Sequence, residues 1–348
     1  MSNPANPPFI AIVGATGAVG VELLGCLERR GTPLSGVRLL ASARSAGRLL
    51  PFRGAMLAVE ELTEHSFDGV DIALFSAGAT LSRQYAPIAL RAGARVVDNS
   101  SAFRMQADVP LIVPEANGDA LRTDDRLIAN PNCVAAIASV ALAPLARLRA
   151  ITRLNMATYQ AASGAGAAAV EELRQGTRAI LANEPFEPQV LPHTLAFNFF
   201  SHNAAIDPDS GYNGEELKVM EELRRILTLP GLPIGVTCIR VPVPRAHGIS
   251  LSVEFDTPLA ADEARAALQG APGLRVVDDR AANHFPMPSE ASGQDDVLVG
   301  RIRSDLGDPS GRTLTMFVVG DQLLKGAALN AVQIAEALLA GSPALAEA

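Results

Sequence analysis

The sequence has no tryptophan, few other aromatic residues and only three cysteines among its 348 residues. The cysteines, Cys26, Cys133 and Cys238, are far apart and odd in number, so they predict neither a disulfide framework nor a metal site. Runs of basic residues are also missing, and 37 acidic residues outnumber 29 basic ones for a net charge of −8. This balance argues against a nucleic-acid partner.

Long uninterrupted hydrophobic stretches are missing as well. Residues 9–27 are broken by Glu22 and several glycines, and residues 134–148 by Pro144 and Arg147, so neither stretch predicts a membrane span. The first residues, MSNPANPP, have no positive region and no apolar region, so we expect no signal peptide. Together with the cysteine usage, these features predict a cytoplasmic protein that does not bind a membrane.

Alternating strands and helices are what the first part of the sequence does contain. Nearly half of the residues are hydrophobic, which is enough to bury the cores of two domains. Short apolar runs predict strands at 9–13, 37–41, 70–76, 96–99 and 127–129, and helical periodicity predicts helices at 19–30 and 81–92. This alternation predicts right-handed βαβ units and a parallel sheet, as in a Rossmann-like domain.

The pattern changes after about residue 150. We expect long strands, several of them antiparallel, at 151–159, 236–243, 249–255, 297–302 and 314–319, with helices at 167–181 and 215–227. Residues 183–212 are predicted to be irregular, and a strongly apolar helix at 323–340 is expected to return to the first domain. The predicted fold class is α/β, with a Rossmann-like NADP-binding domain followed by an α+β domain.

A glycine-rich turn follows the first predicted strand. Its sequence, Gly14-Ala-Thr-Gly17-Ala-Val-Gly20, has glycines that let the backbone approach a pyrophosphate, and a helix is expected to begin at about Ala18. The position of this turn between a predicted strand and a predicted helix favours a dinucleotide site over an ordinary glycine-rich turn. The candidate cofactor contacts here are Gly14, Thr16, Gly17, Ala18 and Val19.

No acidic residue follows the second predicted strand, where proteins that prefer NAD usually place one. The segment instead has Ser42, Arg44 and Ser45, with Arg48 nearby, which could hold a 2′-phosphate by charge-assisted hydrogen bonds. This favours NADP as the cofactor. The alternative is that these are solvated loop residues.

Cys133 follows the turn Asn130-Pro-Asn132 and begins a predicted apolar helix. A thiolate in the first turn of a helix is stabilised by the helix dipole and by free N–H groups, and Asn132 is a candidate N-cap that could also hold an oxyanion. The alternative is a buried structural cysteine, which is the reading we expect for Cys26 and Cys238.

A cysteine thiolate beside a nicotinamide predicts attack on a carbonyl and passage through a thiohemiacetal and a thioester. This chemistry needs an acid/base, and His247 is the best candidate because it follows a strand in a Pro/Gly loop with two arginines nearby. The remaining histidines have no comparable setting and are predicted to be structural: His65, His193, His202 and His284.

These motifs together resemble the aspartate-semialdehyde dehydrogenase family from one end of the chain to the other. The matching segments are GATGAVG (14–20), ASARSAG (41–47), LFSAG (74–78), VVDNSSAFRM (96–105), VPLIVPEAN (109–117), IANPNC (128–133), ATYQAASGAG (157–166), LAFNF (195–199), GYNGEELK (211–218), TCIRVPVPRAH (237–247), VLVGRIRSD (297–305) and KGAALNAVQIAE (325–336). Each piece is weak alone, and the combination is specific.

The resemblance implies a role for each matching position. The implied catalytic residues are Cys133 as nucleophile, Gln160 as an orienting group, His247 as acid/base, and Asn132. The implied substrate contacts are Arg240 for the carboxylate, Glu215 for the ammonium, and the pair Arg104 and Lys218 for phosphate. Further implied cofactor contacts are Ser76, Gly78, Ser163, Gly164 and Gln322.

The implied reaction is the NADPH-dependent reductive dephosphorylation of aspartyl phosphate to aspartate semialdehyde, in amino-acid biosynthesis. The resemblance also implies a dinucleotide-binding domain of residues 1–132 with 325–348, a catalytic and dimerisation domain of residues 133–324, and a homodimer or a dimer of dimers. Aspartyl phosphate, aspartate semialdehyde and phosphate are the implied partners, with no nucleic acid and no metal.

The sequence departs from the family pattern near the nucleophile and the nicotinamide. The departures are Val134 and Ala135 after the cysteine, Ala246 before the histidine, Gln322, Leu324, and the segment 199–203. They leave two alternatives open: a catalytically silent relative that acts as a binding or scaffold protein, and a reductase of the N-acetylglutamyl-phosphate type. Glu215 argues against the second alternative because that substrate has an acylated amine.

Overall fold

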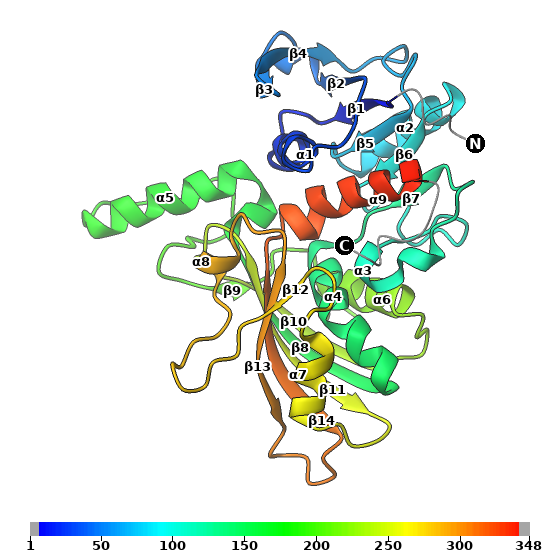
Figure 1. Cartoon of the computed structure of the whole chain (residues 1–348). Coiled ribbons are helices and arrows are strands. Elements are labelled where there is room, and N and C mark those ends of the chain that lie inside the picture. Colours follow the sequence, from blue (N-terminus) through cyan, green and yellow to red (C-terminus); the bar gives the residue numbers. More distant parts are fainter. Residues whose placement is uncertain (1–6, 341–348) are drawn as a thin grey trace. The chain divides into compact units, whose positions relative to one another are not determined.

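The computed structural model describes residues 7–340, and these residues form two units with one sheet each. Of the described residues, 7–132 and 327–340 make up the first unit and 133–326 the second. The predicted class, a Rossmann-like domain and an α+β domain, is confirmed (Figure 1).

The sheet of the first unit is parallel over most of its width. Its strands lie in the order β3-β4-β2-β1-β5-β6-β7: Leu49–Phe52, Ala55–Glu61, Gly36–Ala41, Phe9–Val13, Ile72–Phe75, Arg95–Asp98 and Leu127–Ala129. The five predicted strands are all present, whereas β3 and β4, which pair antiparallel with each other at the edge, were not predicted. The central strands β1 and β5 are almost entirely buried, as strands covered on both faces must be.

Helices α1 (Ala18–Arg29), α2 (Ala79–Arg91) and α9 (Leu329–Ala340) belong to this unit, together with the short α3 (Pro114–Asn117). Helix α9 packs against α1, and its Glu336 forms an ion pair of 2.7 Å with Arg30 and accepts a hydrogen bond from Thr32 Oγ1. The expected return of the last helix to the first domain is therefore confirmed. The prediction of one continuous helix over 323–340 is wrong, because a π-helical turn, Leu324–Ala328, precedes α9.

The sheet of the second unit is mixed. Its strands lie in the order β12-β13-β14-β11-β8-β10-β9: Leu274–Val276, Val297–Ser304, Thr313–Gly320, His247–Phe255, Ile151–Gln160, Ile234–Arg240 and Phe200–Ser201. The pairs of β11 with β8 and with β14, and of β13 with β14, are antiparallel as expected. The pair of β8 and β10 is parallel, so these two strands end at the same edge, with Arg240 opposite Gln160.

Helix α4 (Cys133–Leu148) supplies much of the core of this unit, because nearly all its residues after Cys133 are buried up to Leu145. It packs against α6 (Gly214–Ile226), α7 (Ala261–Leu268) and the sheet. The remaining helices are α5 (Ala167–Leu181) and the short α8 (Pro288–Ala291).

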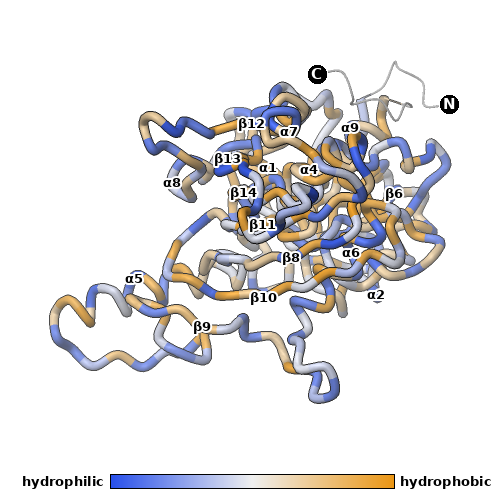
Figure 2. Tube along the Cα trace, turned by 90° about the horizontal axis from the view of Figure 1, so that it is seen from below, coloured by the Kyte–Doolittle hydropathy of each residue, from blue (hydrophilic) through white to orange (hydrophobic). Residues whose placement is uncertain are grey.

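The segment from α5 to β9, residues 182–199, is irregular as predicted and extends from the rest of its unit (Figures 1 and 2). Its anchor is the buried carboxylate of Glu172 in α5, which accepts hydrogen bonds from the backbone N–H groups of Val190 at 2.6 Å and Leu191 at 2.9 Å. A buried carboxylate of this kind needs such donors. Leu191 also packs in an apolar cluster with Leu173 and Leu195.

Candidate active site

Cys133 differs from the other two cysteines in its surroundings. It is the first residue of α4 and is partly exposed, whereas Cys26 in α1 and Cys238 in β10 are buried, as predicted. Burial raises the pKa of the Cys238 thiol to about 12, so this thiol stays protonated and unreactive at neutral pH. Only Cys133 therefore combines partial exposure with a helix N-terminus.

The π-helical turn fixes the position of Cys133. A Cβ atom on Gly326 would lie 2.7 Å from the Cβ atom of Cys133, closer than carbon atoms can pack. Only glycine permits this approach of the turn to the nucleophile. π-helical turns often occur at functional sites, and this one supports the first residue of α4.

Three strand ends bring predicted site residues to one edge of the sheet. Gln160 ends β8, Arg240 ends the parallel strand β10, and His247 begins β11, whose residue Gly248 lies opposite Tyr159 of β8. All three side chains are buried, with 2% or less of their surface exposed. The pairing of the strands thus assembles residues that are as far as 87 positions apart in the sequence (160 to 247).

Glu215 joins this group from α6. Its Oε1 accepts a hydrogen bond of 3.0 Å from Gln160 Nε2. The preceding Asn213 caps α6, since its side chain accepts from the N–H groups of Glu215 and Glu216, while Glu216 bonds back to the Asn213 N–H. This capping box holds the start of α6, and the second carboxylate oxygen of Glu216 accepts from Cys238 N in β10, which ties α6 to the sheet.

His247 is neutral in this environment. Burial lowers its pKa well below 6.5, and the nearby positive charge of Arg240 acts in the same direction. Its Nδ1 lies 3.0 Å from the backbone N–H of Ala161, which can only donate, so Nδ1 accepts and the neutral ring has its proton on Nε2. Nε2 has no hydrogen-bond partner among the described residues, so it is available to a substrate oxygen.

Residues outside the turn that precedes His247 hold the backbone of that turn in place. Ala246 has a left-handed backbone conformation with φ of +71°, and its N–H donates to Gln322 Oε1 at 2.8 Å. The other end of the Gln322 amide donates to Ser163 Oγ. The neighbouring Arg245 pairs with the buried Asp321 at 2.6 Å. Alanine stands at this strained position with its methyl group buried in an apolar cluster of the core.

The guanidinium of Arg240 is held by two bonds. Nη1 donates to Ala161 O at 2.7 Å, and Nη2 donates to His202 Nε2 at 2.8 Å. Burial lowers the pKa of Arg240, while the negative charges of Cys133 and Glu215 oppose that shift. The interaction with Cys133 is mutual, so the guanidinium favours the thiolate.

Residues 161–164 connect these side chains. The backbone of Ala161 bonds both His247 and Arg240, and a Cβ atom on Gly164 would lie 3.1 Å from Arg240 Nη1 and 3.3 Å from His247 Nε2. The segment therefore packs directly on the acid/base and on the arginine. Ser163, in the same segment, accepts a hydrogen bond from the side-chain amide of Gln322.

In the first unit, the glycine turn lies between β1 and α1. Gly14 has φ of +87°, and a Cβ atom there would lie 2.5 Å from Ser76 O in the turn after β5. Helix α1 begins at Ala18, as predicted, and its N-cap Gly17 has no side-chain cap. Because β2 and β5 flank β1 on opposite sides, this edge is a topological switch point, where dinucleotides bind.

The residues expected at the adenosine end also lie in this unit. Arg44 and Ser45 form a short 3₁₀ turn after β2, Arg44 is exposed, and Thr16 Oγ1 donates to Ser45 Oγ at 3.4 Å. Gly78 caps α2 with φ of +85°. The glycine turn before α1 and the donors of the exposed Arg44 fit a dinucleotide with a 2′-phosphate.

The two residues expected at the phosphate belong to different units. Arg104, in the first unit, is buried and donates to the carbonyl oxygens of Asn130 at 2.9 Å and Asn99 at 2.7 Å. Lys218 is exposed on α6, in the second unit. Their pairing at a phosphate stays a prediction.

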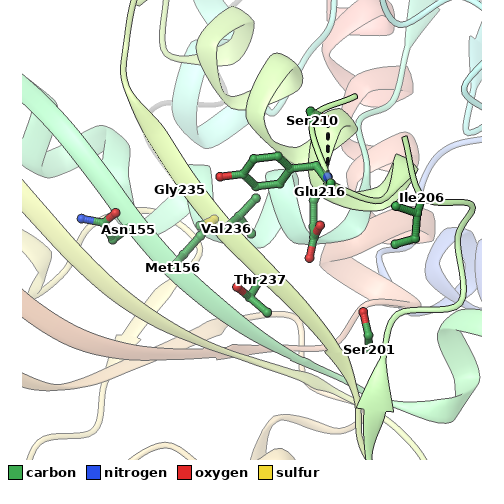
Figure 3. Close-up of a pocket in the computed structure, with 11 residues that line it drawn as sticks. Asn155, Met156, Ser201, Ile206, Ser210, Glu216, Gly235, Val236 and Thr237 are labelled. Atoms are coloured by element: carbon green, nitrogen blue, oxygen red, sulfur yellow. Dashed lines mark hydrogen bonds between the residues drawn. The ribbon is translucent and has the colours of Figure 1, made fainter. Parts of the chain in front are cut away.

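A hollow of about 650 Å³ lies elsewhere on the second unit. Figure 3 shows that side chains of β8 and β10, such as Asn155 and Thr237, and Ile206 from the loop before α6 surround it. None of the predicted catalytic residues lines it. The hollow therefore does not include the side chains of Gln160 and Arg240 at the strand edge.

Sequence reasoning predicted His202 to be structural and did not foresee its contact with Arg240. His202 follows β9, and its ring contacts Arg240. It also missed Ala161, whose side chain has no chemistry and whose backbone makes the contacts. No local pattern shows either role, because both depend on pairing between distant strands.

The departures from the family pattern have packing explanations in part. Val134, Ala135 and Leu324 are buried, so apolar side chains suit their positions.

Within residues 7–340, no group of three or more His, Cys, Asp or Glu side chains is arranged to hold a metal ion. In that same range, every helix is too short or too polar to cross a membrane.

Comparisons with known proteins identify the family of the chain. The family described as semialdehyde dehydrogenase, NAD binding domain, matches residues 9–124, and its dimerisation domain matches residues 142–325. The chain is 48% identical to the aspartate-semialdehyde dehydrogenase of Synechocystis over 96% of its length and 98% of that protein. It is 43% identical to that of Bacillus subtilis, over 94% of this chain and 96% of the relative.

Solved structures give the same result. A crystal structure of aspartate semialdehyde dehydrogenase II from Vibrio cholerae, complexed with ASA, has a TM-score of 0.92 and 39% identity, and it covers 97% of this chain and 99% of its own. By sequence profile, by overall identity and by fold, the chain belongs to the aspartate-semialdehyde dehydrogenase family of oxidoreductases.

Proposed function

We propose that the chain catalyses the NADPH-dependent reductive dephosphorylation of L-aspartyl 4-phosphate to L-aspartate 4-semialdehyde through a thioester on Cys133. The observation that carries the proposal is the assembly of Gln160, Arg240 and His247 at one edge of the sheet, with the negative charge of Cys133 acting on Arg240. A nucleophile, a proton donor and a fixed cation are the groups that acyl transfer from a carboxylate-bearing substrate requires.

In the first step, the Cys133 thiolate attacks the acyl carbon, the carbon–oxygen bond to the phosphoryl group breaks, and phosphate leaves. When bound, NADPH supplies the hydride that reduces the thioester carbonyl. The resulting thiohemiacetal oxyanion accepts a hydrogen bond from His247 Nε2–H, since Nδ1 is occupied by Ala161 N–H. The carbon–sulfur bond then breaks, which releases the aldehyde and restores the thiolate.

The substrate's two charged ends fit two side chains of the site. Arg240 retains one N–H on each terminal nitrogen and the N–H of Nε, which has no partner among the described residues, for the α-carboxylate. Glu215, buried beside Gln160, is the acceptor for the α-ammonium. An N-acetylated substrate would offer no ammonium to this carboxylate, so the proposed role of Glu215 favours a substrate with a free amine.

NADP is the proposed cofactor. Gly14, Gly17 and the first turn of α1 would hold the pyrophosphate, and Arg44 with Ser45 would hold the 2′-phosphate. Ser163, Gly164 and Gln322 are the proposed contacts of the nicotinamide in the second unit.

A homodimer is the proposed assembly. The second unit matches a dimerisation domain. The segment around α5 and residues 182–199 exposes large apolar side chains, among them Leu181 at 70%, Phe197 at 67% and Phe199 at 67%. Exposed apolar groups on an extended segment are typical of protein interfaces. Light scattering of the purified protein would give the mass directly.

The free state of all three cysteines supports a cytoplasmic location.

The test of the reaction is the reduction of NADP by the purified protein supplied with L-aspartate semialdehyde and inorganic phosphate. Turnover should require phosphate and should be lost in Cys133→Ala. Cys238→Ala is the matched control, because it removes a buried thiol whose pKa is raised to about 12, and it should retain turnover. Intact NADP binding with no turnover by the wild type would overturn the proposal.

A further inference from the structure

We infer that His202 is a positioning residue that fixes the guanidinium of Arg240 in the orientation needed for the substrate carboxylate. The inference rests on the proposed role of Arg240. Its basis is the 2.8 Å contact between Arg240 Nη2 and His202 Nε2, opposite the 2.7 Å bond from Nη1 to Ala161 O. The two bonds restrain both terminal nitrogens of the guanidinium.

The backbone holds His202 in place for this contact. Its N–H donates to Cys238 O in β10 at 2.9 Å, directly beyond the short pairing of β9 with β10. His202 therefore has its position set by the strand that ends in Arg240. The Cα atom from which the imidazole extends is thereby held beside the end of β10.

The direction of the bond fixes the charge of the ring. Arginine has no acceptor, so His202 Nε2 must accept, and the ring must be neutral with its proton on Nδ1. The Ala204 N–H also lies 3.2 Å from Nδ1, and a neutral imidazole can accept at only one nitrogen. The shorter bond comes from a charged donor and is the stronger one, so the lone pair belongs to Nε2.

The surroundings of His202 favour this neutral form. Burial is the main cause that lowers its pKa, and the positive charges of Arg240 and Lys218 add to the effect, while Glu215 and Glu216 oppose it. His247, across the edge on β11, is neutral as well. A proton on His202 would place a donor against a donor and release the guanidinium.

The restraint of Arg240 by His202 should affect the affinity for the substrate rather than the chemical step. With both terminal nitrogens restrained, the remaining N–H groups of Arg240 point in a fixed direction. A bidentate bond to a carboxylate then costs little conformational entropy of the side chain. The ring of His202 contacts Arg240 and lies beside the Ala204 N–H, so it acts on the substrate through Arg240. Its loss should raise KM for the carboxylate substrate and leave kcat nearly unchanged.

The experiment compares four variants in the phosphate-dependent reduction of NADP. His202→Ala should raise KM for L-aspartate semialdehyde by about 10-fold, the usual effect of losing one hydrogen bond to a charged group. KM for NADP and kcat should stay within about 3-fold. His202→Gln should recover most of the affinity, because the glutamine carbonyl can accept from Arg240 Nη2. His193→Ala is the matched control, since that ring is exposed and contacts only Phe200 among the described rings.

Arg240→Ala separates this inference from the function on which it rests. If Arg240→Ala leaves KM unchanged, the proposed role of Arg240 fails and the inference fails with it. If Arg240→Ala raises KM while His202→Ala does not, only the inference fails. The pH profile gives a second measurement: KM of the wild type should rise as the pH is lowered, whereas KM of His202→Gln should stay flat. Equal profiles for the two proteins would overturn the inference.

Discussion

Two turns of this chain present functional groups in opposite ways. The glycine turn, residues 14–20, takes its shape from its own residues: Gly14 has φ of +87°, and a Cβ atom on Gly20 would lie 2.2 Å from Gly14 O in the same turn. The histidine turn, residues 241–247, takes its shape from distant residues. Gln322 holds Ala246, Asp321 holds Arg245, and Ala161 holds the imidazole of His247.

The comparison teaches where each turn is vulnerable. A turn set by glycines fails when a side chain is added, because the backbone around it, within the turn and in the turn after β5, leaves no space. A turn set by distant partners fails when a partner is removed, even though the turn's own sequence is intact. The following predictions use this difference, beginning with the largest expected effect.

Replacement of His247, the last residue of the histidine turn, should have the largest effect. We expect His247→Asn to lower kcat by about 10²- to 10⁴-fold, the usual contribution of a general acid/base. Steady-state kinetics with saturating L-aspartate semialdehyde and NADP measure this. His284→Asn is the control, because His284 is exposed and pairs with Glu290, outside the site. A kcat for His247→Asn within threefold of the wild type would exclude the proposed role.

Addition of a methyl group to the glycine turn should have the next largest effect. We expect Gly14→Ala to lower the free energy of unfolding by about 2–4 kcal/mol, from the left-handed backbone and the clash at 2.5 Å with Ser76 O. KM for NADP should rise as well. Gly31→Ala is the matched control in the same unit, since φ is +64° there and no atom lies within 4 Å of the added Cβ. Equal losses in the two variants, measured by denaturant unfolding, would show that the clash contributes nothing.

Removal of the support behind the histidine turn should have an intermediate effect. We expect Gln322→Ala to lower kcat by about 10-fold or more, because Gln322 holds the backbone next to His247 and a small misplacement of the acid/base is costly. Thermal unfolding should show a loss of about 1–2 kcal/mol from the unpaired Ala246 N–H. An unchanged kcat would exclude the supporting role of Gln322, and a rise in KM for NADP alone would leave only its proposed contact with the cofactor.

The pH dependence of stability should show the smallest effect. His247 has a lowered pKa and is neutral in the folded protein, whereas the unfolded chain takes up a proton near 6.5. Below that pH the unfolded state binds more protons, so the free energy of unfolding should fall as the pH falls, by at most about 1.4 kcal/mol per unit for this group. Urea unfolding at a series of pH values measures the slope. His247→Asn should reduce it, and an unchanged slope would contradict the assignment.

Much of the fold could be predicted from local patterns. The strands of the first unit, the start of α1 at Ala18 and the start of α4 at Cys133 follow from apolar runs and from the residues that end them. The strands β3 and β4 were missed, because Pro51 and the alternation of exposed residues give only a weak strand signal at an edge. The π-helical turn before α9 was missed because its sequence continues the apolar helix without a break.

The sequence by itself determined the elements that depend on neighbours in the chain: the glycine turn, the helix that begins at the nucleophile, and the separation of one partly exposed cysteine from two buried ones. The tertiary structure alone decided which groups meet. Ala161 reaches His247 across 86 positions and Arg240 across 79, and His202 reaches Arg240 across 38. Such contacts arise from strand pairing and register, and no local preference of the chain encodes the distance between two strands that fold together.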